Sequence, residues 1–199
     1  MSKTTASAAA PRSMTTKTLA YCALLAALTV VFARLIIPMP NAFTRISIEA
    51  VPTFVAGMLF GPLPGALVGF VADLVGCLFS GYGYNPLFCI PPILYGLAGG
   101  FFRPMLLKKP DIPHLALAWL PPVVLGSILY QSWALTVIYS TEGAFWPNFL
   151  VRLGARGIQF AITFVLDVLI CELLLKARVF ERVGLWKPND NYKKEEENL

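Results

Sequence analysis

Apolar residues dominate the chain in six runs, and each run ends at Pro, Gly or charged residues. Runs this long without strict alternation of polar and apolar positions predict helices and not strands. Pro and Gly clusters mark the boundaries, because both residues interrupt helices. The pattern therefore predicts an all-α chain with helices over residues 17–37, 48–60, 66–79, 87–107, 114–139 and 149–177.

The breaking residues also predict irregular features of these helices. The segments 38–41 (Pro-Met-Pro-Asn) and 61–65 (Gly-Pro-Leu-Pro-Gly) should end or turn the chain, and the Pro-Pro pair at 121–122 should kink its helix. The helices expected at 48–60 and 66–79 are shorter than the roughly 20 residues that cross a bilayer. We expect these two helices to lean, break or line a cavity, where irregular backbone is tolerated.

The composition indicates that these helices pack in a membrane and not in water. Of the 199 residues, 57% are hydrophobic and only 14% are charged, with a mean hydropathy of +0.67. A soluble domain carries about 25% charged residues, so this chain lacks the polar surface of a water-soluble globule. We expect a multi-pass cell-membrane protein with a six-helix domain over 17–178, a disordered cytoplasmic tail at 1–16 and a charged cytoplasmic tail at 179–199.

The basic residues fix the expected orientation. All but four of the sixteen Lys and Arg lie in the N-terminal tail, between 103 and 109, or from 176 onward. Six helices place these groups on one side, which is then the cytoplasmic face, whereas five or seven helices would separate them. The net charge of +5 follows from this bias and does not indicate a nucleic-acid partner. A cleaved N-terminal signal peptide is the less favoured alternative, because further membrane segments follow.

Residues suited to catalysis or metal binding form no recognisable pattern. The four cysteines lie in apolar runs without Cys-x-x-Cys or Cys/His spacing, and the single His114 starts a helix. The motifs HExxH and GxSxG and the Walker A sequence are absent from the sequence. We therefore expect no cofactor, no metal site and no enzymatic activity.

The four remaining basic residues are all arginines on the opposite, outer side: Arg34, Arg45, Arg152 and Arg156. Arginine inside or beside a bilayer is costly and by default marks a functional site or an ion pair. Arg152 and Arg156 are four residues apart, so they project from one face of a helix. Guanidinium groups stay charged and bind carboxylates with paired hydrogen bonds. The sequence thus predicts a pocket for an anionic small molecule.

Three acidic residues could neutralise these arginines internally: Glu49, Asp73 and Glu142. Pairing of Asp73 with an arginine as structural support is one open alternative. Anchoring at the lipid interface is the alternative for Arg45 and Arg152. Arg34 and Arg156 are the sharper candidates for ligand contact.

Two further acids, Asp167 and Glu172, lie near the opposite end of the last helix. Glu172 stands four residues before Lys176, which is the spacing of a helical ion pair. We expect a solvated ion pair here and no functional site.

Aromatic and amide side chains are expected at the level of the arginines, notably Tyr84, Asn85, Gln131 and Trp133. Flat rings stack on planar heterocycles, and amides read their polar edges. The alternative is a belt of aromatic residues at the membrane interface. Convergence of these groups with arginines favours a binding site.

Because of Ala23 and Ala27, one face of the first helix has no bulky side chains at these positions. Small residues at this spacing let another helix approach closely in lipid. The spacing is common in membrane helices, so it favours internal packing about as much as a partner interface.

Several of these residues lie in segments that resemble the substrate-binding S components of energy-coupling factor (ECF) vitamin transporters, most closely the folate-specific group. The similar segments are Arg-Ile-Ser at 45–47, the Val-Pro-Thr-Phe run at 51–62, and the Gly-rich segments at 65–69, 72–76 and 83–86. The Ala23/Ala27 spacing is similar to the alanine motif through which such helices dock onto the coupling protein.

The resemblance implies a six-helix bundle whose vitamin pocket opens to the outside. It also implies a transmembrane coupling protein and two ABC-type ATPases as partners, with the S component toppling in the membrane to carry its ligand inward. Folate also suits the candidate residues considered without the resemblance. Arginines match its glutamate carboxylates, and Asp73 could accept the N–H pair of its pterin ring. The alternatives are another vitamin such as pantothenate, riboflavin or a queuosine precursor, an intramembrane enzyme, and a structural or sensor protein.

Overall fold

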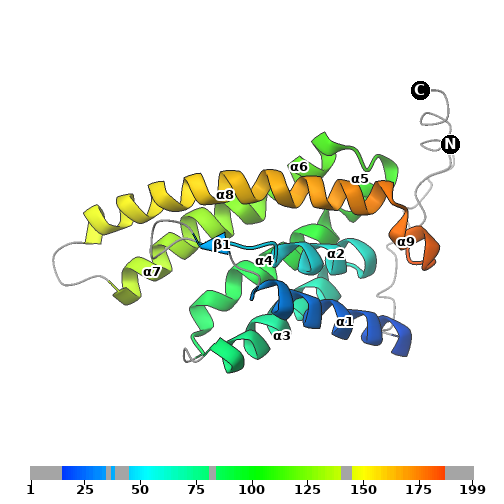
Figure 1. Ribbon diagram of the computed structural model, residues 1–199, viewed down its shortest axis with the longest axis horizontal. Coiled ribbons are helices and arrows are strands. Elements are labelled where there is room, and N and C mark those ends of the chain that lie inside the picture. The colour runs from blue at the N-terminus through cyan, green and yellow to red at the C-terminus, as the bar shows by residue number, and fades with distance from the viewer. Residues whose placement is uncertain (1–14, 35–36, 39–44, 81–83, 140–144, 187–199) are drawn as a thin grey trace, which may run out of the picture.

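The computed structural model describes residues 15–34, 37–38, 45–80, 84–139 and 145–186, which form an elongated helical bundle (Figure 1). The described chain is helical apart from a two-residue antiparallel pair, in which Ile37 lies opposite Ile46 and Pro38 opposite Arg45. The elements in order are α1 Thr16–Phe32, β1 Ile37–Pro38, β2 Arg45–Ile46, α2 Ala50–Phe60, α3 Pro62–Ser80, η1 Pro86–Cys89, α4 Ile90–Phe101, α5 Arg103–Lys108, α6 Ile112–Pro121, η2 Pro122–Tyr130, α7 Gln131–Tyr139, α8 Phe145–Lys176 and α9 Val179–Arg182.

The expected helices are present, with three corrections to their boundaries, one of which is that the last helix begins at Phe145 and not at 149. The first helix ends at Phe32 and not at Ile37, because Pro38 pushes the residue before it into the extended conformation of β1. The third helix begins at Pro62, four residues earlier than expected. Gly61 alone makes the turn with a φ of 107°, and Pro is favourable at the first position of a helix.

Two expected helices are subdivided. The segment 87–107 consists of the 3₁₀ turn η1 and the helices α4 and α5, and 114–139 consists of α6, η2 and α7. The expected kink at 121–122 takes the form of a π-helical stretch, η2, which is wider than an α-helix. Proline has no backbone N–H, so two successive prolines leave carbonyls of the preceding turn without their usual partners.

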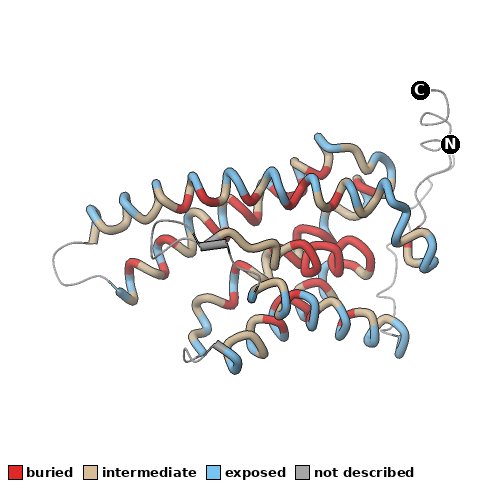
Figure 2. Tube along the Cα trace, in the orientation of Figure 1, coloured by how far each residue is buried: buried red, intermediate tan, exposed pale blue. Residues whose placement is uncertain are grey.

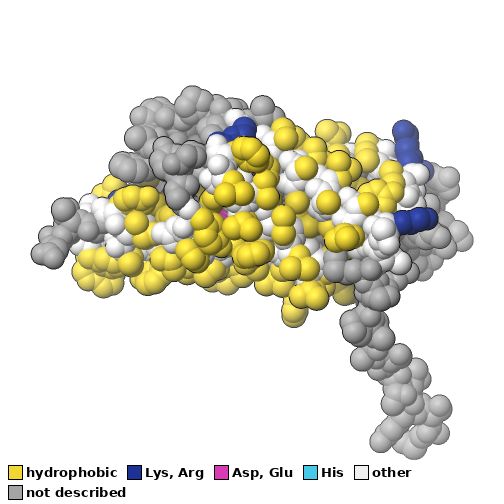
Figure 3. All heavy atoms as spheres, turned by 90° about the horizontal axis from the view of Figure 1, so that it is seen from below, with side chains coloured by type: hydrophobic (Ala, Val, Ile, Leu, Met, Phe, Trp, Pro, Cys, Tyr) yellow, Lys and Arg dark blue, Asp and Glu magenta, His cyan; other side chains and the backbone are white. Residues whose placement is uncertain are grey.

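Three of the described helical segments are long and apolar enough to cross a membrane: Pro62–Phe79, Ile112–Tyr139 and Phe145–Lys176. The expectation that 66–79 is short is therefore wrong, whereas α2 has only 11 residues. The apolar helices Thr16–Phe32 and Pro86–Phe101 are of intermediate length. Large apolar side chains lie on the outside of the bundle, and Figure 3 shows one face that they cover almost completely. This distribution is typical of a surface in contact with lipid.

Helices α2, α3 and α4 pack with their backbones almost touching, and we call these three helices the glycine layer. A Cβ atom added at Gly57 would collide with the carbonyl oxygen of Gly96, and one at Gly96 would collide with that of Gly65. Every residue of α2 from Val51 to Leu59 is buried (Figure 2). Small residues allow this approach, which maximises van der Waals contact between helices in lipid.

Trp119 of α6 joins the glycine layer to the rest of the bundle. Its side chain is completely buried, and its ring stacks on Phe54 of α2 at 4.5 Å and tilts against Tyr95 of α4 at 5.4 Å. Beyond this contact, α7 and the first half of α8 project past the other helices (Figure 1). We call α7 together with residues 145–160 the α7–α8 arm.

Candidate functional site

Arg156 of α8 lies at the base of the α7–α8 arm. The side chain is 8% exposed, and its Nη1 donates hydrogen bonds to Oε1 of Gln131 at 3.0 Å and to the carbonyl oxygen of Ser127 at 3.4 Å. Its guanidinium carbon also lies 5.5 Å from the centre of the Phe160 ring. Both of these oxygen acceptors are neutral, so they orient the guanidinium without cancelling its charge. The structure thus brings the predicted residues Arg156 and Gln131 together.

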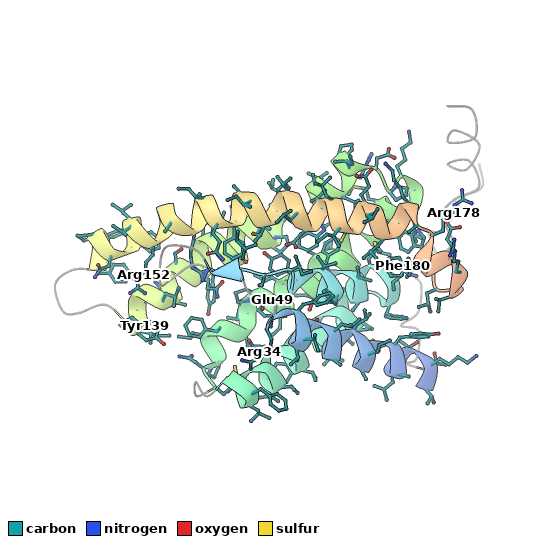
Figure 4. All side chains as sticks on the ribbon, in the orientation of Figure 1. Arg34, Glu49, Tyr139, Arg152, Arg178 and Phe180 are labelled. Carbon is teal, nitrogen blue, oxygen red and sulfur yellow. The ribbon has the colours of Figure 1, made fainter. Side chains whose placement is uncertain are left out.

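Arg152 lies one turn earlier on the same face of α8, as its spacing predicts. Its Nη1 donates a hydrogen bond to the carbonyl oxygen of Leu135, and its guanidinium lies 6.0 Å from the centre of the Tyr139 ring (Figure 4). Tyr139 is exposed at the end of α7. Arg152 therefore links α8 to α7 and places a cation near the free end of the α7–α8 arm.

The other two predicted arginines lie outside helix α8. Arg34 follows α1, is exposed, and donates a hydrogen bond of 3.0 Å to the carbonyl oxygen of Gly76 in the last turns of α3 (Figure 4). A cation here also complements the negative end of the α3 dipole. The backbone of Arg45 lies in β2, while its side chain is outside the described residues. Strand β2 lies against α8, so the Arg45 backbone is near the helix that carries Arg152 and Arg156, whereas Arg34 bonds α3.

Asp73 of α3 and Tyr84 share a neighbour, Cys89, which the sequence pattern did not single out. The buried thiol of Cys89 lies close to both the Asp73 carboxylate and the Tyr84 hydroxyl. Oδ2 of Asp73 is buried and makes no hydrogen bond in the described structure. Cys89 looked like a small buried hydrophobic residue in the sequence, and its position directly after the 83–86 loop is the one signal that pointed to this contact.

Asn85 and Trp133 have surroundings that do not tie them to the arginines. Oδ1 of Asn85 accepts a hydrogen bond from the Leu87 backbone N–H at 3.1 Å, which caps η1. Trp133 is 43% exposed and packs against Tyr130 with their ring centres 5.9 Å apart. It lies on the outward face of α7, since its neighbours Ser132 and Ala134 are buried. The structure does not bring Trp133 and Arg156 together.

Comparison with known proteins identifies the chain. Residues 13–176 match the family described as the ECF-type riboflavin transporter, S component. The chain belongs to this S-component family. The resemblance seen in the sequence is therefore confirmed. Members of the family are membrane-embedded substrate-binding subunits that work with an energy-coupling module and do not themselves catalyse a reaction.

Solved structures agree with the family assignment of this S component. The crystal structure of FolT bound with folic acid superposes with a TM-score of 0.65 and 31% identity, covering 78% of this chain and 90% of FolT. A second structure, of the S component of a bacterial ECF transporter, has a TM-score of 0.57 and 20% identity over 84% of this chain and 97% of its own. The second likeness establishes the fold alone.

Curated relatives match a shorter part of the S component. Two UPF0397 proteins from Streptococcus pneumoniae, strains CGSP14 and ATCC 700669 / Spain 23F-1, are each 35% identical over 78 residues. The match covers 39% of this chain and 43% of each relative, so the chain spans less than half the length of these proteins.

The α1 face of this S component carries the predicted partner residues. Ala23 and Ala27 are both exposed, whereas the residues that directly precede them, Cys22 and Ala26, are buried against the bundle. The alanines therefore lie on the outward face of α1, and the internal-packing alternative does not apply within the described structure. A second helix could approach this face closely.

One acidic residue of the S component lies where the sequence pattern did not place it. Lys176 and Glu172 form the expected ion pair at 2.6 Å. Asp167, however, is only 3% exposed, and its Oδ1 makes no hydrogen bond in the described structure. The expectation of a solvated Asp167 is wrong, because this face of α8 turns toward Trp119 and Tyr95. In the described segments, no group of three His, Cys, Asp or Glu side chains could hold a metal ion.

Proposed function

We propose that this S component binds folate or a related pterin from outside the cell and delivers it inward by reorienting on its coupling module. The observation that carries the proposal is the likeness to FolT bound with folic acid, at 31% identity over 90% of that chain. Arg156 adds a chemical reason, since it is a nearly buried cation oriented by two neutral oxygens. Guanidinium groups in such a setting suit the glutamate carboxylates of folate.

The remaining candidate residues receive roles that match their positions. Arg152 extends the cationic surface along the α7–α8 arm, and Gln131 orients Arg156. The pair Asp73 and Tyr84 offers an acceptor for ring N–H groups and a ring for stacking, with Cys89 between them. Asn85 shapes η1 beside that pair. Arg34, Arg45 and Trp133 are the less strongly supported members of the proposed site.

Riboflavin is the second candidate ligand, because the family model carries that name. Its ribityl chain has no charge, whereas folate carries glutamate carboxylates, which guanidinium groups bind with paired hydrogen bonds. The charge of the arm therefore favours folate.

In our proposal the S component spans the cell membrane six times. The spans are α1, α2, α3, the η1–α5 segment, the α6–α7 segment and α8, with both tails on the cytoplasmic side. The start of α1 and the helix α9 lie at the same end of the bundle, which supports an even number of spans (Figure 1). The basic residues from Lys176 onward also belong to this end.

Ligand titration of the purified full-length chain tests the substrate. We expect folate to bind tightly, pteroate (which lacks the glutamate) more weakly, and riboflavin and pantothenate undetectably at micromolar concentration. Arg156→Gln should weaken folate binding by about 10- to 100-fold, since it removes a charge-assisted contact. The matched control Arg182→Gln changes an exposed arginine of α9 and should have no effect. Tight riboflavin binding without folate binding would replace the proposed substrate.

Uptake in cells tests the proposed partners, which are a transmembrane coupling protein and two ABC-type ATPases. Ala23→Trp with Ala27→Trp should abolish uptake and leave ligand binding intact, because indole rings block close helix approach. Leu125→Trp is the control, since Leu125 is an exposed apolar residue on η2. Uptake that survives the alanine substitutions would exclude α1 as the docking helix.

A further inference from the structure

A buried hydrogen-bonded pair connects α4 to η2 next to Arg156. The hydroxyl oxygens of Tyr95 and Ser127 are 2.8 Å apart, and the two residues are 5% and 1% exposed. The Trp119 ring tilts against Tyr95, and Asp167 and Arg156 of α8 lie on the same side of the pair. Polar groups buried in a membrane bundle cost free energy unless they are paired, and packing alone would be served as well by Phe and Ala. The pair therefore calls for a role other than filling space.

Ser127 contacts two helices through different atoms. Its side-chain hydroxyl bonds Tyr95 of α4, and its backbone carbonyl oxygen accepts from Nη1 of Arg156 on α8 at 3.4 Å. The same Nη1 donates to Gln131, four residues further along. One continuous set of hydrogen bonds thus runs from α4 through η2 to the arginine.

The backbone of η2 explains why this serine reaches both helices. The π-helical stretch begins at Pro122, and its extra width changes the direction of the groups that follow. Gly126 lets η2 approach α4, because a Cβ atom there would lie 3.1 Å from Cδ1 of Leu94. The rotation of η2 about its axis is consequently fixed on the α4 side by Tyr95 and Gly126. The direction of the Ser127 carbonyl follows from that rotation.

We infer that Tyr95 and Ser127 are positioning residues that hold Arg156 in the orientation required to bind the carboxylate of the ligand. The inference rests on the proposed function, in which Arg156 contacts that carboxylate. Tyr95 does not touch the ligand itself. It fixes η2, and η2 supplies one of the two neutral oxygens on the guanidinium. Preorganisation of this kind strengthens binding because the arginine does not have to be ordered when the ligand arrives.

A double-mutant cycle on the full-length protein tests the inference. Tyr95→Phe and Ser127→Ala should each weaken folate binding by about 3- to 10-fold, the range for loss of one neutral hydrogen bond. The affinity for 6-hydroxymethylpterin should not change, since this ligand has the pterin ring but no carboxylate. In an Arg156→Gln background, neither substitution should weaken folate binding further, because the group that they position is absent. Tyr21→Phe is the control, as Tyr21 stacks on Phe60 in another part of the bundle.

Three outcomes would overturn the inference: unchanged folate binding in both variants, equal losses for folate and 6-hydroxymethylpterin, or additive losses in the Arg156→Gln background. If Tyr95→Phe fails to fold, as judged by thermal unfolding, the Ser127→Ala arm gives the same readouts. Normal folate binding by Arg156→Gln alone would instead contradict the proposed function, and the two failures are therefore distinguishable.

Discussion

The glycine layer and the α7–α8 arm are held together by different forces. In the glycine layer, the backbones of α2, α3 and α4 meet at Gly57, Gly65 and Gly96, with no space for a side chain. In the arm, long side chains cross between helices, and Arg152 and Arg156 donate to backbone carbonyls. The first region packs through shape alone, whereas the second uses charged groups that could also bind a ligand.

Because of this difference, we regard the glycine layer as a rigid scaffold and the α7–α8 arm as part of the candidate binding site. Backbone contacts between three helices tolerate no adjustment, because any displacement opens gaps that lipid or water must fill. Hydrogen bonds from flexible arginine side chains can be exchanged for bonds to a carboxylate at small cost. We therefore expect ligand binding to change the arm and the part of α3 around Asp73, and to leave α2 and α4 as they are.

The largest effect should come from Gly96→Val in the glycine layer. Its side chain would collide with the backbone at Gly65 and Ala66, which cannot move without displacing α3. We expect a loss of folded protein, corresponding to more than about 3 kcal/mol, measured by thermal unfolding and size-exclusion chromatography in detergent. Gly154→Ala in the arm is the matched control.

Nothing lies within 4 Å of a Cβ atom placed at Gly154, so this substitution should be neutral or stabilising by up to about 1 kcal/mol. If Gly96→Val unfolds at the same temperature as the unmodified protein, the close packing of the layer is not what stabilises it.

Trp119→Ala should have the next largest effect, because it removes the ring that joins the two regions. Its indole stacks on Phe54 of the layer and is completely buried. We expect the free energy of unfolding to fall by about 3–5 kcal/mol. Trp146→Ala, an exposed tryptophan at the start of α8, should cost less than about 1 kcal/mol. Similar losses in both variants would show that Trp119 does not join the regions.

A smaller effect is expected for Asp167→Asn. This substitution keeps the shape of a buried side chain, and it removes an ionisable group whose Oδ1 makes no hydrogen bond in the described structure. We expect the free energy of unfolding to rise by about 1 kcal/mol and folate affinity to stay unchanged. Glu172→Gln breaks the ion pair with Lys176 and should change stability by less than about 0.5 kcal/mol. A loss of folate binding in Asp167→Asn would show that the site extends along α8.

Most helix boundaries could be predicted from the sequence, because Pro, Gly and charged residues stop helices by local mechanisms. The turn at Gly61 and the irregular helix after 121–122 are examples. The exact start of α3 was missed, since Pro62 and Pro64 looked like turn residues. They lie in the first turn of a helix, where the missing N–H groups cost nothing.

The candidate site was predicted less well, because helices that are apolar on every side do not reveal which face turns inward. The spacing of Arg152 and Arg156 placed them on one face of α8, and this prediction is confirmed. The same spacing could not show that Trp133 faces outward or that Asp167 is buried. These orientations depend on contacts between helices, such as the Tyr95–Ser127 pair, that are distant in sequence.

Hydrogen–deuterium exchange of the full-length protein, with and without saturating folate, tests the division between scaffold and site most directly. We predict that folate slows exchange in residues 131–139 and 145–160, whereas exchange in residues 50–60 and 90–101 stays the same. Slower exchange in α2 and α4 without any change in the arm would contradict this account.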